Sequence, residues 1–446
     1  MVVGLQTVFW FLVALTILVT IHEFGHFYVA RRCGVKVLRF SIGFGKPLYS
    51  WWSPSGTEFC IAPIPIGGYV KMLDAREGDV PAADMPYEFT NKKLWQRMAI
   101  LFAGPIANLI LAVLLYWIIL IPSSLQPIPF VGKVEPGSIA AAAGLREGQE
   151  IIAIDGVATP TQRDVVRRLV ERIGETGEIT FTVKYTDSDL QYTSAANIDN
   201  WLRGEKQPDL LGGLGLRFYD PPEVIVGRVV EGSPAEQSGF QLNDRILFAD
   251  DVAVEDWQYW VNYISERPDQ TIRVELIREG EELQIDVTPK KIIDDSGLER
   301  AQIGMGLKVD DKYLRNYQYS LPGAFVEAVG ETWDNCALVV MSVKKLLTGE
   351  LSVKSLNGHI KIAQVARSHA EAGPITFVAF LAFFSVSLGV FNLFPIPPLD
   401  GGHILYFSIE ALKGSPLSER VQLFGFQVGL VLVVGVMLLA LYNDVT

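Results

Sequence analysis

The sequence predicts a multi-pass α-helical membrane protein that also carries water-soluble α+β domains. Three observations predict this class. The mean hydropathy of +0.26, with 20% charged residues, is too high for an ordinary soluble protein and too low for a chain buried wholly in a bilayer. Long uncharged stretches lie towards both ends of the chain, and an internal repeat occupies its middle. At about 150 residues per soluble domain, the chain has room for two or three units.

Four stretches are apolar enough to cross a bilayer, which takes about 20 apolar residues in a helix. We expect four transmembrane helices, at 1–30, 98–121, 372–399 and 421–443. Cleaved signal peptides begin with a basic region, whereas the first lysine or arginine here is Arg31. The first stretch is therefore expected to remain in the protein as a helix.

The charges between these stretches predict the orientation of the chain. The segment 31–97 carries ten lysines and arginines against six acids, whereas 122–374 carries 26 against 39. Because cytoplasmic loops are enriched in lysine and arginine, we expect 31–97 to lie on the cytoplasmic side. The long acidic segment and both termini then lie outside the cytoplasm.

Composition also excludes several classes of protein. Cys33, Cys60 and Cys336 are too few and too scattered for a disulfide framework or a thiolate zinc site. The net charge of −12 argues against nucleic acid as a partner, because nucleic acid requires a basic surface. A single soluble domain and a disordered chain are likewise excluded.

The internal repeat has an offset of 95 residues, because Val134–Ala140 recurs as Val229–Ala235. Each copy reads as a strand, a short helix that ends at glycine, and a further strand and turn. We therefore expect two tandem extracytoplasmic domains, at 128–219 and 221–310.

The two copies resemble bacterial PDZ domains. The first copy departs from the pattern, with Gly148-Gln149 where the second has Asn243-Asp244. The resemblance implies a groove in which backbone N–H groups of an apolar-Gly-apolar loop bind a peptide C-terminus beside a strand. The candidate groove residues are Gly215, Leu216, Gly306 and Leu307. A folded spacer without a ligand is the alternative, because a motif alone does not show a working groove.

The most specific motif is His22-Glu23-Phe24-Gly25-His26, which continues directly from the first apolar stretch. Charged residues in a membrane helix cost about 2.5–3.5 kcal/mol on insertion scales, so they remain there when something binds them. Residues four apart share one helix face, where His22 and His26 can both reach one zinc ion. Glu23 lies about 100° further round, where it can touch a zinc-bound water without being a ligand. The alternative is two core histidines that share this spacing by chance.

A catalytic zinc typically takes three protein ligands and leaves a fourth position for water. The better candidate for the third ligand is Asp400, which follows the third predicted span and should lie towards the same side of the membrane as His22. The other candidates are His359, His369 and His403. Alternatively, Asp400 only starts a turn with the two glycines that follow it.

Together these residues resemble the site-2 protease family, with the histidine motif early, the PDZ-like pair in the middle and Asn392–Gly401 late in the chain. The resemblance implies an intramembrane zinc metalloprotease that holds one Zn²⁺ per chain on His22, His26 and Asp400. Glu23 would then be the general base for attack by a zinc-bound water. The resemblance also implies substrate-binding roles for Asn392, Pro395 and Pro397, and a supporting role for Asn108.

The cytoplasmic segment 31–97 offers a binding surface for a substrate helix, which must unwind and find new backbone partners before it is cut. We expect a small membrane-associated β-hairpin sheet here, with Gly43, Phe44 and Gly45 at an edge that adds the substrate as a strand. The alternative is an interfacial anchor, since Trp51 and Trp52 suit a membrane boundary.

The resemblance further implies a bacterial inner-membrane protein whose PDZ-like domains lie in the periplasm and screen substrates. These substrates would be single-span proteins such as anti-sigma factors, and remnant signal peptides. His359 stands where family members usually have proline, which leaves the local loop geometry open. In the connecting segment 311–371, Phe325–Leu347 has a helical apolar period and is either a helix on the membrane surface or a linker.

Two other functions fit part of this pattern. A zinc transporter or sensor would use the same three ligands, but transport gives no reason for Glu23, and four spans are few for a transporter. A PDZ scaffold with a non-catalytic membrane zinc site would need neither the intact ligands nor Glu23. The protease is therefore the favoured prediction.

Overall fold

The computed structural model describes the chain except residues 1, 77, 186–187, 222, 294–298 and 446. Outside the described residues lie the first residue of the first predicted span, 77 of the predicted cytoplasmic segment, 186–187 of the first predicted repeat, and 222 and 294–298 of the second. The chain forms two compact units. We call them the helical unit (Met1–Pro122, Tyr319–Met341 and Asn357–Thr446) and the β-rich unit (Ser123–Gln318 and Ser342–Leu356).

Four helices in the described part of the chain are long and apolar enough to cross a membrane. They are α1 (Val2–Arg32), α2 (Leu94–Leu120), α10 (Pro374–Leu393) and α12 (Glu419–Val445). The third predicted span, 372–399, extends six residues too far, because α10 ends at Leu393. Three prolines follow before residue 399, and proline cannot continue a helix.

Three further helices belong to the region after the repeats: α8 (Leu321–Leu347), α9 (His359–Ala372) and α11 (Asp400–Lys413), with the 3-10 turn η3 (Val353–Ser355) between α8 and α9. The sequence predicts part of α8 but neither α9 nor α11. The missed α11 begins Asp400-Gly401-Gly402, and two glycines in a first turn carry little helical propensity.

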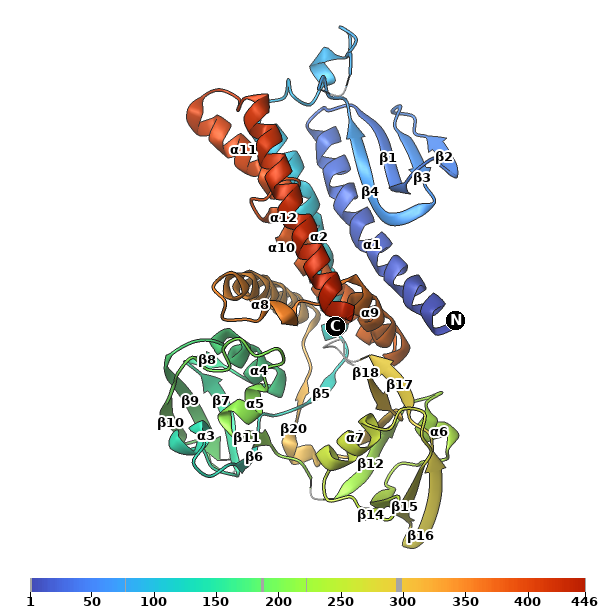
Figure 1. Cartoon of the computed structure of the whole chain (residues 1–446), viewed down its shortest axis with the longest axis vertical. Helices are drawn as coiled ribbons and strands as arrows, with labels where there is room; N and C mark the ends of the chain where they lie inside the picture. Colours follow the sequence, from blue (N-terminus) through green and yellow to red (C-terminus); the bar gives the residue numbers. More distant parts are fainter. Residues whose placement is uncertain (1, 77, 186–187, 222, 294–298, 446) are drawn as a thin grey trace. The chain divides into compact units, whose positions relative to one another are not determined.

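Close helix packing in the helical unit depends on small residues. A Cβ on Gly25 of α1 would lie 2.2 Å from the carbonyl oxygen of Ala103 in α2. On the other side of α2, Ala112 and Tyr116 pack with Ala382, Val386 and Val390 of α10 in one buried cluster. The helix α2 therefore joins α1 and α10 (Figure 1).

A four-stranded sheet follows α1 and lies beside it (Figure 1). Its strands are β1 (Val37–Phe44), β2 (Tyr49–Trp52), β3 (Glu58–Ile61) and β4 (Ile64–Met72), in the order β2-β3-β1-β4, and the 3-10 turn η1 (Met85–Tyr87) precedes α2. The predicted edge at Gly43-Phe44-Gly45 is wrong, because β1 is an inner strand and Phe44 pairs with Ile64. The edges are β2 and β4, and β4 is the one that lies along α1.

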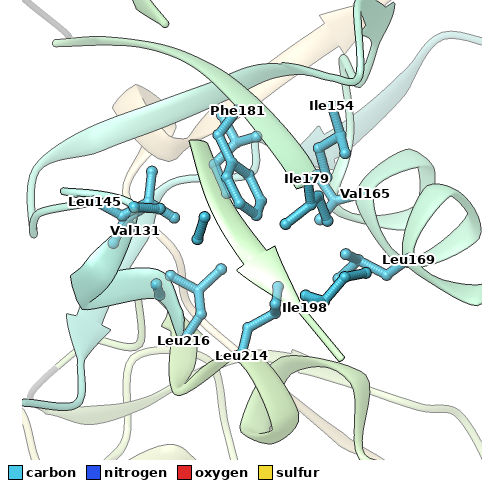
Figure 2. Close-up of a cluster of buried hydrophobic side chains, with 14 of the residues drawn as sticks. Val131, Leu145, Ile154, Val165, Leu169, Ile179, Phe181, Ile198, Leu214 and Leu216 are labelled. Carbon is cyan, nitrogen blue, oxygen red and sulfur yellow. The ribbon is translucent and has the colours of Figure 1, made fainter. Parts of the chain in front are cut away.

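The first domain of the β-rich unit contains β6 (Val131–Val134), α3 (Ile139–Ala142), β7 (Gln149–Ile154), β8 (Val157–Ala158), α4 (Gln162–Arg172), β9 (Gly177–Tyr185), β10 (Gln191–Ile198), α5 (Leu210–Leu214) and β11 (Leu216–Phe218). Alternate residues of β9, among them Ile179 and Phe181, point into its core, where they meet Val165 and Leu169 of α4 (Figure 2). This alternation is the period-2 pattern of a strand with one buried face.

The second domain repeats this order with β12 (Val224–Val229), α6 (Pro234–Gln237), β13 (Arg245–Ala249), β14 (Val252–Ala253), α7 (Trp257–Ser265), β15 (Ile272–Arg278), β16 (Glu281–Val287), β17 (Lys290–Ile293), β18 (Glu299–Gln302) and β19 (Met305–Leu307). The hairpin β17–β18 stands where the first domain has α5. Trp260 of α7 is buried in its core.

The structure corrects the equivalence of the two glycine loops. Leu216 pairs with Val134 in the first domain, and Met305 pairs with Val229 in the second. Gly215 therefore corresponds to Gly304 and not to Gly306. Both have positive φ, +71° and +76°, and a Cβ on either would lie within 2.3 Å of the serine that caps the short helix. The predicted groove residues Gly306 and Leu307 lie two residues too far along the chain.

Both chain connections of the β-rich unit return to the first domain. Strand β5 (Ser124–Pro127) before the domains pairs with β20 (Leu314–Tyr317) after them, next to the 3-10 turn η2 (Asp311–Tyr313). In the last turn of α8, buried Lys345 donates hydrogen bonds to the carbonyl oxygen of Ile173 and to the carboxylate of Glu350. The second domain is thus an insertion between two segments that bind the first.

Candidate metal centre

Three side chains from opposite ends of the chain converge in the helical unit. The Nε2 atoms of His22 and His26 lie 3.1 Å apart. Oδ2 of Asp400 lies 3.1 Å from Nε2 of His22 and 3.4 Å from Nε2 of His26. Both histidines are buried. The structure thus brings together the three ligands that the sequence predicts.

This triangle fits a tetrahedral zinc ion. Zinc bonds of about 2.0–2.1 Å at tetrahedral angles separate the ligand atoms by about 3.3 Å, which is close to the three distances here. Among the described side chains, Oδ2 of Asp400 is a buried oxygen without a hydrogen bond of good geometry. The donor set is therefore anionic and open to a cation.

A backbone contact fixes the tautomer of His26. Its Nδ1–H donates to the carbonyl oxygen of Ile100 in α2, at 2.8 Å. A neutral imidazole that carries its proton on Nδ1 has a lone pair on Nε2, the atom that faces Asp400. Second partners of this kind orient histidine ligands in metal sites.

Asn108, about two turns after Ile100 in α2, contacts the Nδ1 atom of His22. Its side-chain nitrogen lies 3.4 Å from Nδ1 of His22, while its Oδ1 is buried without a partner. Exchanging the two amide atoms lets Oδ1 accept from Nδ1–H, because the two orientations of an amide are hard to distinguish. The carbonyl oxygen of Asn108 accepts from Ser385 of α10, at 2.7 Å. This arrangement leaves Nε2 of His22 as the metal-facing lone pair.

Gly104 provides the space for the two rings. A Cβ at this position would lie 2.3 Å from Nε2 of His26 and 2.8 Å from Cε1 of His22. Only glycine lets α2 approach the rings so closely. The sequence shows this residue as part of a small-residue run, and the default interpretation of that run is helix packing.

The position of Asp400 depends on how α11 is held. Asp400 is the first residue of α11. One turn from the other end of that helix, Glu410 accepts two hydrogen bonds from Arg97 of α2, and both side chains are mostly buried. The Arg97 guanidinium also lies 4.6 Å from the ring centre of Phe407. These contacts tie α11 to the helix that orients the histidines.

The metal triangle and Glu23 line one pocket of about 510 Å³. Its other lining residues come from three places: Tyr69, Val70 and Met72 of β4, with Asp74 and Arg76 after it; Phe89, Ile100 and Leu101; and Asn392, Pro398, His403 and Phe407. Glu23 lies by the backbone amide of Val70. The pocket therefore has a strand edge along one wall.

The other predicted site residues have different positions. Asn392 lines the pocket and donates to the carbonyl oxygen of Leu388, at 3.0 Å. Pro395 and Pro397 lie in the turn between α10 and α11, and Pro398, not they, lines the pocket. Phe44 does not line it either, although its ring stacks on that of Tyr69.

Sequence reasoning missed Val70 and Tyr69 as pocket residues, and it considered His403 only as another candidate metal ligand. The residues of β4 could have been found as a strand from the segment 66–72. Which strand lies beside Glu23, however, depends on the pairing of distant segments. The position of His403 in the pocket could have been predicted, because residues three apart share a helix face and Asp400 was already a candidate ligand.

The departure at His359 leaves the backbone there intact. His359 is the first residue of α9, a position that suits proline because its N–H has no helical partner. Asp444, at the end of α12, accepts from the N–H groups of Gly358 and Ile360, at 2.7 and 2.9 Å. The helix N-terminus is therefore capped without any contribution from the side chain or N–H of residue 359.

Comparison with known proteins agrees with the geometry of this site. Residues 10–436 match the model of Peptidase family M50. The chain is 41% identical to "Regulator of sigma-E protease RseP" of Escherichia coli K12 and 40% identical to "Protease RseP" of Yersinia pestis, covering 97% of each chain in both cases. It is 38% identical to a "Putative zinc metalloprotease" of Vibrio cholerae, over 98% of this chain and 97% of the relative.

One solved structure, the PDZ domain of an SdrC-like protein from Listeria monocytogenes, matches 22% of this chain and 99% of its own at 22% identity. Its TM-score of 0.18 is too low to carry weight for the fold. The family match covers most of the chain, and the relatives match almost all of it. The chain therefore belongs to peptidase family M50, the site-2 proteases, and is a membrane zinc metalloprotease.

Proposed function

We propose that this protein cuts peptide bonds within transmembrane segments of single-span proteins, with one zinc held by His22, His26 and Asp400. The single observation that carries the proposal is the triangle of ligand atoms 3.1–3.4 Å apart, which has the size of a tetrahedral zinc site. Glu23, beside the triangle in the same pocket, is the proposed general base.

Zinc, when bound, supplies a Lewis acid for the peptide carbonyl and lowers the pKa of water to about 7. Side chains of the protein hold the ion, orient its ligands and transfer the proton. Nε2 of both histidines and Oδ2 of Asp400 hold the ion, while Ile100 and Asn108 keep the imidazoles in the required tautomer. The Glu23 carboxylate takes a proton from the attacking water and delivers it to the leaving amine.

We propose that the substrate binds as an added strand on the outer edge of β4, replacing the predicted edge at Phe44. β4 is an edge strand, and Tyr69, Val70 and Met72 line the pocket. An unwound transmembrane segment needs new backbone partners, and a strand edge provides them. Asn392 faces the same space, whereas Pro395 and Pro397 shape the turn that leads to Asp400.

The names of the relatives point to sigma-E regulation, so we propose membrane-bound anti-sigma factors as substrates, with remnant signal peptides as a second group. The location is then the bacterial inner membrane, with both termini and the β-rich unit periplasmic and the metal centre towards the cytoplasm. The two domains of the β-rich unit are proposed as PDZ-like screens. Their candidate loops for a peptide C-terminus are Gly215-Leu216 and Gly304-Met305.

The test compares purified wild type and Glu23→Gln for zinc content and for cleavage of a single-span reporter in detergent. We expect about one zinc in each protein and cleavage by the wild type alone. Cleavage that persists in Glu23→Gln contradicts the role of Glu23. A wild type without zinc contradicts the ligand set.

A further inference from the structure

His403 is a pocket residue to which the proposed function gives no task. It lies on the first turn of α11, three residues after Asp400, and lines the same pocket as Glu23 and the metal ligands. Side chains three apart on a helix are neighbours, with Cβ atoms about 5–6 Å apart. The imidazole is therefore held next to the reacting centre by the helix that also holds the third ligand.

The ring of His403 has an unused donor. It is half-buried and makes an edge-on contact with Tyr406, with ring centres 6.1 Å apart. Within the described chain, neither of its nitrogens has a hydrogen bond to the protein. Two other polar groups of the pocket are already engaged, since Asn392 donates to Leu388 and Arg76 binds the carboxylate of Asp74.

The surroundings favour the neutral form of this imidazole. Burial lowers the pKa of His403, the charge of Asp400 opposes that change, and Arg76 adds to it. A neutral imidazole carries one N–H and can donate one hydrogen bond. Such a donor, fixed in place before the reaction, stabilises negative charge that develops on an oxygen.

We propose that His403 is a further catalytic residue, which donates a hydrogen bond to the carbonyl oxygen of the scissile peptide as negative charge gathers there. The inference rests on the proposed function, because it needs a peptide bound in this pocket. No bond of the imidazole forms or breaks, and its proton stays on the ring throughout. The attacking water and the leaving amine remain the task of Glu23.

A donor used mainly in the transition state affects kcat more than KM. Loss of one such donor typically lowers kcat by about 10²–10³-fold. We therefore expect this loss in His403→Phe, with KM within about twofold of wild type. In His403→Gln the amide can still donate, and kcat should recover at least tenfold relative to His403→Phe.

The experiment uses the full chain in detergent with the single-span reporter, alongside wild type, Glu23→Gln and the matched control His369→Phe. His369 lies on α9, where its Nδ1 bonds to Val365, and it does not line the pocket. A second readout is the visible spectrum of each cobalt-substituted protein, which reports the ligand geometry and needs no turnover.

The inference stands if His403→Phe keeps wild-type cobalt spectrum and zinc content, loses kcat as stated and is partly rescued by glutamine. It is overturned if His403→Phe keeps wild-type kcat, or if its cobalt spectrum changes, since His403 would then only position Asp400. A wild type that does not cleave, or a Glu23→Gln protein that does, removes the proposed function and this inference with it.

Discussion

At the scale of single residues, the proposed metal centre depends as much on its supporting contacts as on its ligands. His22 and His26 could be predicted because four residues along one helix fix their spacing. The contact of His26 with Ile100 could not, because Ile100 lies on another helix, and the supporting role of Asn108 beside His22 was implied only by the family resemblance. The geometry of a side chain against a distant segment has no local signal in a sequence.

We predict that Asn108→Leu weakens zinc binding by about 10–100-fold, the usual effect of losing a second partner of a histidine ligand. The measurement is zinc affinity by competition with a coloured chelator. Asn335→Leu is the control, since Asn335 is also buried in the helical unit but bonds to Tyr116. Equal zinc affinity in Asn108→Leu and wild type would rule out the supporting role.

A second residue-scale prediction concerns Glu88, a buried carboxylate between β4 and α2. It accepts from the N–H groups of Ala75, Thr90 and Asn91 and from the Thr90 hydroxyl. Burial raises the pKa of Glu88, but these hydrogen bonds outweigh it and lower the pKa. A lowered folded pKa gives stability that is present above the unfolded value of about 4.3 and is lost as the pH falls through the folded value.

We therefore expect Glu88→Gln to destabilise this loop by about 1–3 kcal/mol at pH 7, since buried donors lose their charged acceptor. The difference between wild type and variant should shrink as the pH falls below about 4. Limited proteolysis of the loop at pH 7 and below about pH 4 measures this difference in stability. A difference that grows at low pH would show that the carboxylate is not the stabilising group.

At the scale of elements, the longest apolar helices were predictable and the short ones were not. A span of 20 apolar residues is visible in any sequence, whereas α11 begins with two glycines that argue locally against a helix. Packing explains these glycines, because a Cβ on Gly402 would lie 2.4 Å from the backbone nitrogen of Pro397. The β4 edge escaped prediction for a related reason: strand order is set by pairing across the sheet, not by the strand's own residues.

The corrected glycine equivalence makes an element-scale prediction. Gly304→Ala should destabilise the second domain by about 1–3 kcal/mol, because Gly304 has positive φ and its new Cβ would meet Ser233. Gly306→Ala should cost less than about 1 kcal/mol, because φ is ordinary there and its nearest contact is 3.3 Å away. Urea denaturation of both variants compares them. The reverse order would restore the equivalence of Gly215 with Gly306.

We also predict that His359→Pro leaves the stability of the protein within about 0.5 kcal/mol of wild type, because proline is favoured at the first position of a helix. Gly358 before it is already extended, with φ −91° and ψ −173°, as the residue before proline prefers. Asp444→Ala should instead cost about 0.5–2 kcal/mol through loss of the cap. Thermal unfolding of both variants measures these changes. A large loss of stability in His359→Pro would show that position 359 at the start of α9 does not tolerate proline.

At the scale of the whole molecule, the second domain of the β-rich unit is an insertion whose ends meet. The rings of Tyr219, just before it, and Tyr313, just after it, stack with centres 3.9 Å apart. The repeat in the sequence predicts two similar domains but not that the flanking segments bind the first. That difference depends on Lys345 and on the pairing of β5 with β20, all of which lie outside the repeat in sequence.

We predict that replacing 221–310 by a short glycine-serine linker leaves the first domain folded, because its core and the β5–β20 pair stay intact. The shortened protein should keep about one zinc and unfold within a few degrees of wild type. If the second domain screens substrates, cleavage of bulky reporters should rise. A shortened protein that aggregates or loses zinc would show that the second domain supports the fold.

The spacing of the ligands along the chain has a consequence for biosynthesis. His22 and His26 are made before the two domains of the β-rich unit, and Asp400 is made after them. A nascent chain that has inserted α1 and α2 therefore holds two of the three proposed ligands and cannot complete the proposed metal site. Hydrolytic activity then begins only after the segment that carries Asp400 has left the ribosome, so a translation product interrupted before it would sit in the membrane as an inert fragment.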